Sequence, residues 1–132
     1  MVTYYRKDIL SSLHLGIPQT WDDVYSMMAV LNANGYQFYY PQDPSPFIFQ
    51  NGADYYTEDL QRSAVDSPAF YRAFKQYTDL FINYRVPTAA NFLNRFRTGE
   101  MPVGVAGYDM YVLLSTTAPE LNGRWGMAML PG

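Results

Sequence analysis

The sequence contains no cysteine, one histidine and only two lysines among its 132 residues. Without cysteine the chain can form no disulfide, no thiolate nucleophile and no cysteine-ligated zinc site. The single histidine, His14, leaves no His-x-x-x-His metal pair and no obvious partner for a catalytic triad. We therefore expect neither a metal nor a cofactor, and we expect His14 to be a surface or structural residue.

Excess positive charge and long apolar runs are missing as well. Nine basic and twelve acidic residues give a formal net charge of −3, so the chain offers no basic surface for a nucleic-acid backbone. Its apolar stretches are short and interrupted, and none could span a bilayer. The first residues lack the basic and apolar regions of a signal peptide. The chain is therefore expected to be cytoplasmic or to have lost its leader.

Aromatic residues are abundant, at 17% of the chain, with 13 Tyr, 8 Phe and 2 Trp. A hydrophobic fraction of 48% is sufficient for a folded core and argues against disorder. A tyrosine hydroxyl needs a partner or water when it is buried, so this many tyrosines predict half-buried, wet surfaces. Such surfaces suit ligands with both apolar C–H faces and hydroxyls, and sugars are the obvious class.

Strand and helix patterns alternate along the chain. Short β-branched or aromatic runs predict strands at 2–6, 36–40, 101–107 and 124–131. Apolar periodicity predicts helices at 7–16, 17–35, 47–56 (broken at Gly52), 67–87, 88–100 and from Asp109 onward. Proline-rich residues 41–46 and polar residues 57–66 are expected to be loops. The order predicts an α/β layered domain over 1–132, with a small, largely parallel sheet flanked by helices.

Several helix ends carry specific signals. Thr20 followed by Asp23 resembles a capping box, so we interpret this aspartate as a cap and dipole partner rather than a catalytic group. Ser67 before Pro68 is a favoured helix start, and Gly99 a favoured stop. The helix over 67–87 carries a continuous aromatic stripe, which we expect to be core and not a binding site. The stripe consists of Phe70, Phe74, Tyr77, Phe81 and Tyr84.

The stretch "VGVAGYDMY" points to a ligand site at the end of a buried strand. In open α/β sheets, ligands bind beyond the carboxyl ends of strands, where the following helices begin. Gly107 would allow a tight exit, which places Tyr108, Asp109 and Tyr111 on the rim of a cleft. An equally open alternative is that Asp109 caps the helix while the tyrosines pack.

The phrases "YYRKDIL" and "GIPQTWDDVYSMMAVLNANG" together resemble a hallmark of the family 1 extracellular solute-binding proteins of ABC importers, which are maltose-binding-protein-like. Four later phrases match the family in the right order: "FQNGADYY", "DSPAFYRAFKQYTDLF", "FRTGEMPVGVAGY" and "WGMAMLPG". The resemblance covers essentially the whole chain. It implies one lobe of a type II periplasmic-binding-protein fold, and specifically an excised fragment from the central part of the C-terminal lobe.

The resemblance also implies two ligand-facing segments. The expected contact residues are Tyr40, Ser45, Pro46, Phe47, Gln50 and Asn51 after the second strand, and Tyr108, Asp109 and Tyr111 at the later strand exit. Ser45-Pro46-Phe47 stands where the family has a sugar-contacting Glu-Pro-Tyr phrase, and Asp109 stands where it has a stacking tryptophan. These two departures argue against an oligoglucoside specificity.

The family implies a non-catalytic receptor lobe that closes over a solute, expected to be a carbohydrate such as an oligosaccharide, and delivers it to ABC permease subunits. The parent protein would be extracellular, as a membrane-anchored lipoprotein, or periplasmic, with the leader absent here.

Two other functions stay open at this point. A glycoside-active enzyme would need two carboxylates across a cleft, and its candidates are Glu58, Asp59, Glu100, Asp109 and Glu120. A protein-interaction domain, or self-association of the fragment through bared apolar surface, is the other alternative.

Overall fold

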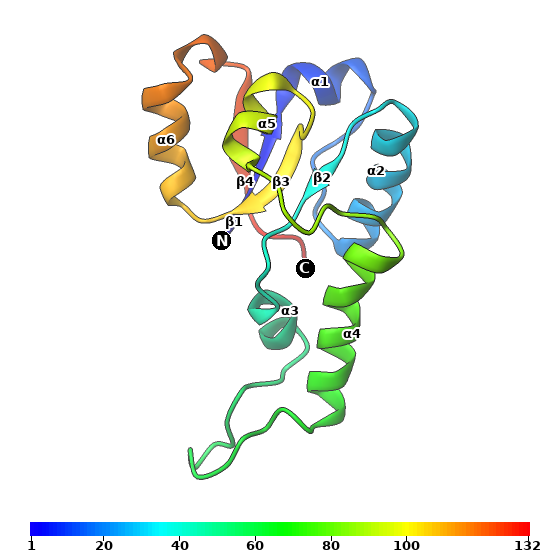
Figure 1. Ribbon diagram of the computed structural model, residues 1–132, viewed down its shortest axis with the longest axis vertical. Helices are drawn as coiled ribbons and strands as arrows, with labels where there is room; N and C mark the ends of the chain where they lie inside the picture. The colour runs from blue at the N-terminus through cyan, green and yellow to red at the C-terminus, as the bar shows by residue number, and fades with distance from the viewer. The chain divides into compact units, whose positions relative to one another are not determined.

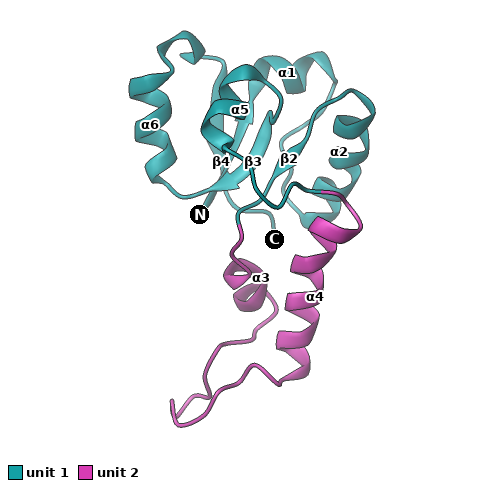
Figure 2. Cartoon of the chain, in the orientation of Figure 1, with its two compact units in different colours: residues 1–41, 86–132 teal, residues 42–85 magenta.

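The computed structural model describes residues 1–132. Contacts divide the chain into two compact units, residues 1–41 with 86–132 and residues 42–85 (Figure 2). None of its helices is both long and apolar enough to cross a membrane.

A four-stranded sheet forms the centre of the first unit (Figure 1). Its strands are β1 (Val2–Arg6), β2 (Phe38–Tyr39), β3 (Val103–Ala106) and β4 (Trp125–Ala128), in the order β2-β3-β1-β4. Helices flank this sheet, which confirms the α/β fold class. The expected parallel character is wrong, however, because β1 pairs antiparallel with both β3 and β4, and only β2 and β3 are parallel.

The direction of β1 follows from the segment that comes after it. Helix α1 (Lys7–Ser12) is short, and residues 13–20 then return to the opposite end of the sheet without regular structure. There the Gly132 N–H donates to the Gln19 carbonyl at 3.0 Å, just beyond the end of β4. Helix α2 (Trp21–Ala33) therefore starts from the end where β1 began. This additional traverse reverses β1 relative to the other three strands.

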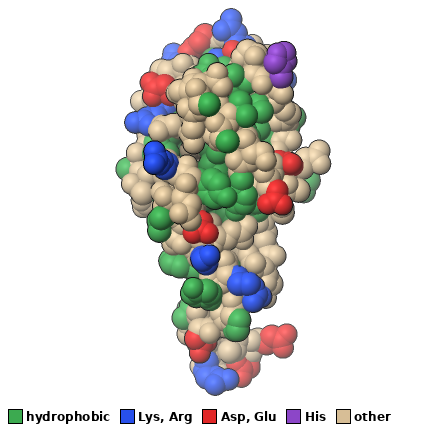
Figure 3. All heavy atoms as spheres, turned by 90° about the vertical axis from the view of Figure 1, so that its right-hand side faces the viewer, with side chains coloured by type: hydrophobic (Ala, Val, Ile, Leu, Met, Phe, Trp, Pro, Cys, Tyr) green, Lys and Arg blue, Asp and Glu red, His purple; other side chains and the backbone are tan.

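The end of α1 also differs from expectation. The helix ends at Ser12 rather than at Gly16, and His14 takes the left-handed backbone conformation with φ 56°. His14 is exposed, and it is the single purple side chain in Figure 3. Its surface position agrees with the sequence prediction.

The capping box of α2 is confirmed. The Thr20 side chain accepts from the Asp23 N–H at 3.1 Å, and the Asp23 carboxylate accepts from the Thr20 N–H at 3.0 Å. Gly35, with φ 80°, follows the C-cap Asn34. The buried side of the helix consists of Trp21, Val24, Met27, Met28 and Leu31.

Helices α5 (Phe92–Thr98) and α6 (Asp109–Thr117) contribute to a core cluster around Tyr4 of β1. A short 3-10 turn, η1 (Pro119–Leu121), connects α6 to β4. The buried members of this cluster are Tyr4, Phe92, Phe96, Met101, Met110, Leu114, Ala118 and Leu121. Gly99 ends α5 with φ 93°, as predicted.

The second unit contains helices α3 (Ser45–Gln50) and α4 (Pro68–Ile82). Ser67 caps α4 as predicted, since its hydroxyl accepts from the Phe70 N–H at 3.1 Å. Helix α3 begins earlier than expected, because Pro46 lies in its first turn, where a missing N–H costs nothing.

The aromatic stripe of α4 is not the buried core that the sequence predicts. Only Ala73 and Leu80 of this helix are buried, whereas Phe74 is 45% exposed. Within the second unit α4 packs against α3, a helix of six residues. So short a helix covers only part of a stripe that extends over four turns.

Candidate ligand site at the end of strand β3

The exit of β3 is held by a buried tyrosine from the neighbouring strand. The Gly107 carbonyl accepts from the Tyr4 hydroxyl at 2.8 Å and from the Met110 N–H at 3.2 Å. Burial raises the pKa of Tyr4, and the nearby Asp109 and Tyr108 raise it further. The phenol therefore stays protonated and remains a donor that fixes the first turn of α6.

Two exposed tyrosines stack on each other beyond this exit. The rings of Tyr108 and Tyr111 are 5.7 Å apart and 14° from parallel, and the two residues are 63% and 41% exposed. Trp125 of β4 supports Tyr111 from behind, edge-on at 5.8 Å, and Trp125 in turn lies 6.1 Å from Tyr4. We call Tyr108 and Tyr111 the tyrosine platform. Its two rings are nearly parallel and partly exposed, and Trp125 connects it to the sheet.

Asp109 lies beside the platform and is an exposed residue. A Cβ on Gly107 would lie 2.5 Å from its Oδ1, so the carboxylate lies over the glycine and would have to rotate away to admit a side chain there. The N-cap of α6 is Tyr108, whose side chain makes no capping bond. The Asp109 carboxylate likewise accepts no hydrogen bond, so the capping alternative lacks its expected contact. This acceptor is available to a ligand hydroxyl.

The five predicted contact residues of the second unit lie on α3 or at its end. Ser45 shares a 2.8 Å hydrogen bond with the Tyr55 hydroxyl, and the Asn51 amide donates to the Phe47 carbonyl at 2.8 Å. Phe47 is fully buried, with its ring near that of Tyr77. Gln50 is exposed and Pro46 half-buried. Gln50 is therefore the most exposed of the five.

Tyr40 belongs to the first unit and is buried, with its ring edge-on to Trp21 at 5.8 Å. In the first unit the structure thus brings Tyr108, Asp109 and Tyr111 together. The residues of α3 form a separate group in the second unit. That both groups contact the same ligand remains a prediction.

Sequence reasoning missed two residues that support the platform, Tyr4 and Trp125. The sequence places both residues in predicted strands and indicates no role for them at a site. Their shared face follows from the register, in which Tyr4 is opposite Met127 and Arg6 opposite Trp125. Alternation along β1 and β4 therefore places Tyr4 and Trp125 on the same side of the sheet. That relation appears only once the pairing of the strands is known.

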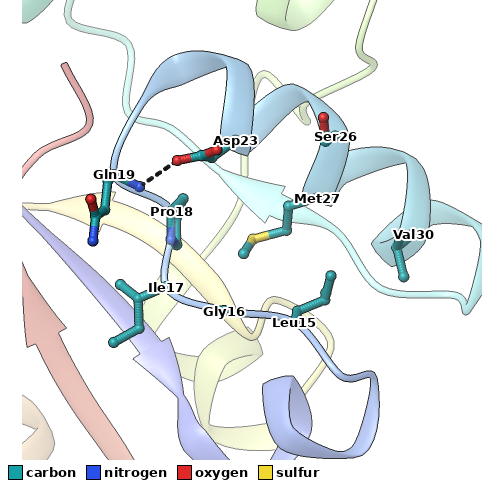
Figure 4. Close-up of a pocket in the computed structure, with 9 residues that line it drawn as sticks. All are labelled: Leu15, Gly16, Ile17, Pro18, Gln19, Asp23, Ser26, Met27 and Val30. Atoms are coloured by element: carbon teal, nitrogen blue, oxygen red, sulfur yellow. Dashed lines mark hydrogen bonds between the residues drawn. The ribbon is translucent and has the colours of Figure 1, made fainter.

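A hollow of about 340 Å³ lies between the irregular segment after α1 and helix α2 (Figure 4). Its one carboxylate, Asp23, is already used by the capping box and points to the Gln19 N–H. We interpret it as a gap between the segment and the helix rather than a ligand site. Its lining consists of Leu15, Gly16, Ile17, Pro18, Gln19, Asp23, Ser26, Met27 and Val30.

Three of the other acids proposed for an enzyme form hydrogen bonds or ion pairs with nearby residues. Asp59 accepts from the Thr57 hydroxyl and the Gln61 N–H in an exposed turn. Glu100 pairs with Arg95, and Glu120 with Arg97. Glu58 is exposed in the same turn as Asp59. No group of three possible metal ligands is present.

Comparisons with known proteins agree with this fold. Similar solved structures include a Thermotoga lettingae TMO solute-binding protein bound with alpha-D-tagatose (22% identity, TM-score 0.83), the GacH receptor of Streptomyces glaucescens GLA.O, solved unliganded and with acarbose (22%, 0.80), and maltose-bound MalE3 of T. maritima (24%, 0.82). They match 98%, 99% and 98% of this chain respectively.

The chain spans 38%, 37% and 38% of the lengths of those three proteins. Comparison with curated proteins finds no match. The family model described as bacterial extracellular solute-binding protein matches residues 1–132, the entire chain. The chain therefore belongs to the family of bacterial extracellular solute-binding proteins.

Proposed function

We propose that this chain is a carbohydrate-binding lobe of an ABC-importer receptor. The observation that carries the proposal is the exposed tyrosine platform with the Asp109 carboxylate beside it. A sugar ring presents an apolar C–H face to an aromatic ring and hydroxyls to an acceptor. The sugars bound by the similar solved proteins, tagatose, acarbose and maltose, support the same ligand class.

In the proposed mechanism the lobe holds one side of the solute. A companion lobe closes over it by hinge motion, and the closed receptor delivers it to membrane permease subunits. The receptor acts outside the cytoplasmic membrane, in the periplasm or as an anchored lipoprotein. Binding is favoured over glycoside hydrolysis because Asp109 is a single carboxylate at the platform, whereas hydrolysis needs a pair.

An amide-shift NMR titration with maltose, tagatose and acarbose tests the proposal. One lobe supplies only part of the contacts, so we expect a Kd of about 1 mM or weaker, with the largest shifts at residues 107–111. Shifts confined to other surfaces would contradict the site. The absence of shifts at sugar concentrations of roughly 50 mM would contradict sugar binding by this lobe.

Variants of the platform identify the contacts. Tyr108→Ala removes one ring, and we expect it to weaken binding by about 1 kcal/mol, or roughly fivefold. Asp109→Asn, which removes the charge but keeps an acceptor, should weaken it less. Tyr56→Ala is the matched control, because Tyr56 is 60% exposed and lies outside both the platform and α4. Equal losses in Tyr108→Ala and Tyr56→Ala would contradict a role for the platform.

We also propose that the isolated chain self-associates through α4. Tyr71, Phe74 and Ile82 are 69%, 45% and 73% exposed, and their spacing places them on one side of the helix. We expect light scattering to detect dimers or larger species at high concentration, and Ile82→Lys to reduce them. A monomer at the highest soluble concentration would argue against this.

A further inference from the structure

Three Asn-Gly pairs occur in the chain, at Asn34-Gly35, Asn51-Gly52 and Asn122-Gly123. Asn-Gly is the dipeptide most open to intramolecular attack, because glycine has no side chain to hinder its own nitrogen. Attack requires the asparagine amide and the following peptide N–H to leave their hydrogen bonds and rotate toward each other. The hydrogen bonds around each pair therefore decide its reactivity.

Two of the pairs are held at helix ends. The Asn34 amide donates to the Val30 carbonyl at 2.8 Å, and the Gly35 N–H donates to the Asn32 carbonyl at 3.3 Å. At the end of α3, the Asn51 amide donates to the Phe47 carbonyl at 2.8 Å and to Gln76 Oε1 at 3.2 Å. The Gly52 N–H donates to the Phe49 carbonyl at 3.1 Å. Both partners of the reaction are thus engaged at each site.

The third pair is different. Asn122, with φ −53° and ψ 126°, and Gly123, with φ 81°, form the centre of a type II turn. The turn is closed by the Arg124 N–H donating to the Leu121 carbonyl at 2.8 Å. Neither the Asn122 side chain nor the Gly123 N–H makes a hydrogen bond, and both residues are exposed. The central peptide can rotate while the closing bond remains intact.

We propose that Asn122 is a site of spontaneous deamidation. The Gly123 nitrogen attacks Asn122 Cγ, a C–N bond forms to close a succinimide, and the side-chain nitrogen leaves as ammonia with the proton from the Gly123 nitrogen. Water then adds to the ring and opens it at either carbonyl. The products are aspartate, or isoaspartate with one more atom in the main chain.

Deamidation would change the turn just before Trp125, the residue that supports the tyrosine platform. The turn leads directly into β4, where Trp125 backs Tyr111. Aspartate adds a negative charge two residues from Arg124, and isoaspartate lengthens the backbone just before the strand. The deamidation itself depends only on the turn and not on any ligand.

The test is peptide mapping by mass spectrometry after incubation of the full chain in mildly alkaline buffer at physiological temperature. At the two helix-end sites the hydrogen bonds must break before the attack can occur. We therefore expect deamidation there to be about tenfold slower than at Asn122, which corresponds to about 1.4 kcal/mol. Isoaspartate should be detected at position 122. The same incubation in denaturant should bring the three sites to similar rates.

The Asn122→Gln variant is the matched control, because glutamine would have to form a less favourable larger ring. It should remove most of the early ammonia release and leave the slow reactions at the other two sites. Folded-state rates at Asn122 no faster than at Asn34 or Asn51 would overturn the proposal. So would an unchanged order of rates in denaturant, since the difference would then come from sequence and not from structure.

Discussion

Replacing Gly104 with alanine is expected to destabilise the first unit by about 1–3 kcal/mol, the usual cost of overpacking a core. Gly104 lies in β3 under a pair of stacked rings, Tyr39 and Phe92, whose centroids are 4.6 Å apart and whose planes differ by 5°. An added Cβ would lie 2.7 Å from the Phe92 ring and 2.8 Å from the Tyr39 Cβ. Neither neighbour can move easily, because Phe92 is buried and Tyr39 pairs with Gly104 in the sheet.

Urea unfolding of the wild type and the variant measures this loss as a lower midpoint at unchanged slope. Gly16→Ala is the matched control, because nothing lies within 4 Å of an added Cβ there and the backbone is not left-handed. We expect that change to stay within about 0.5 kcal/mol. A Gly104→Ala midpoint equal to that of the control would show that the rings are not closely packed over β3.

Local signals were predicted well because each depends on a few neighbouring residues. The capping box of Thr20 and Asp23, the Ser67 cap and the Gly99 stop all act within one helical turn. The tight exit of β3 belongs with them, since a glycine after a small apolar run already predicts a turn there.

Features that depend on distant residues were predicted poorly. The direction of β1 depends on residues 13–20, whose return across the sheet has no periodic signal. The exposure of the α4 stripe depends on how much of it α3 covers, which periodicity within α4 cannot show. Trp125 became recognisable as a support only through its position relative to Tyr111 and Tyr4.

A charge pair between a buried arginine and a partly exposed aspartate at the end of β1 gives the second large expected effect. The Arg6 guanidinium binds both oxygens of Asp8, at 3.0 and 2.8 Å, and also donates to the Phe96 carbonyl near the end of α5 at 2.9 Å. The side chains of Arg6 and Asp8 are 8% and 39% exposed. Asp8→Asn would leave the buried guanidinium without its counter-charge. We expect a loss of about 2–3 kcal/mol, below the full cost of breaking a buried pair because Asp8 is partly solvated.

The same pair predicts how this loss depends on pH. The hydrogen bond from Arg6 lowers the pKa of Asp8, and it outweighs the effect of burial. The stabilisation is therefore fully present above the unfolded pKa of about 4 and is lost as pH falls through the lower folded pKa. The difference in unfolding free energy between wild type and Asp8→Asn should be constant from about pH 7 to 5 and shrink below about pH 4.

Urea unfolding at a series of pH values measures this difference directly. Other carboxyls with lowered pKa values, such as Asp23 and Glu120, are common to both proteins, so their effects cancel in the difference. Asp22→Asn is the control, an exposed change in the first turn of α2 that should cost less than about 1 kcal/mol. If the difference in unfolding free energy between wild type and Asp8→Asn does not shrink in strong acid, the loss comes from altered side-chain packing and not from the lost charge. A loss no larger than that of the control would mean that the Phe96 carbonyl holds Arg6 without Asp8.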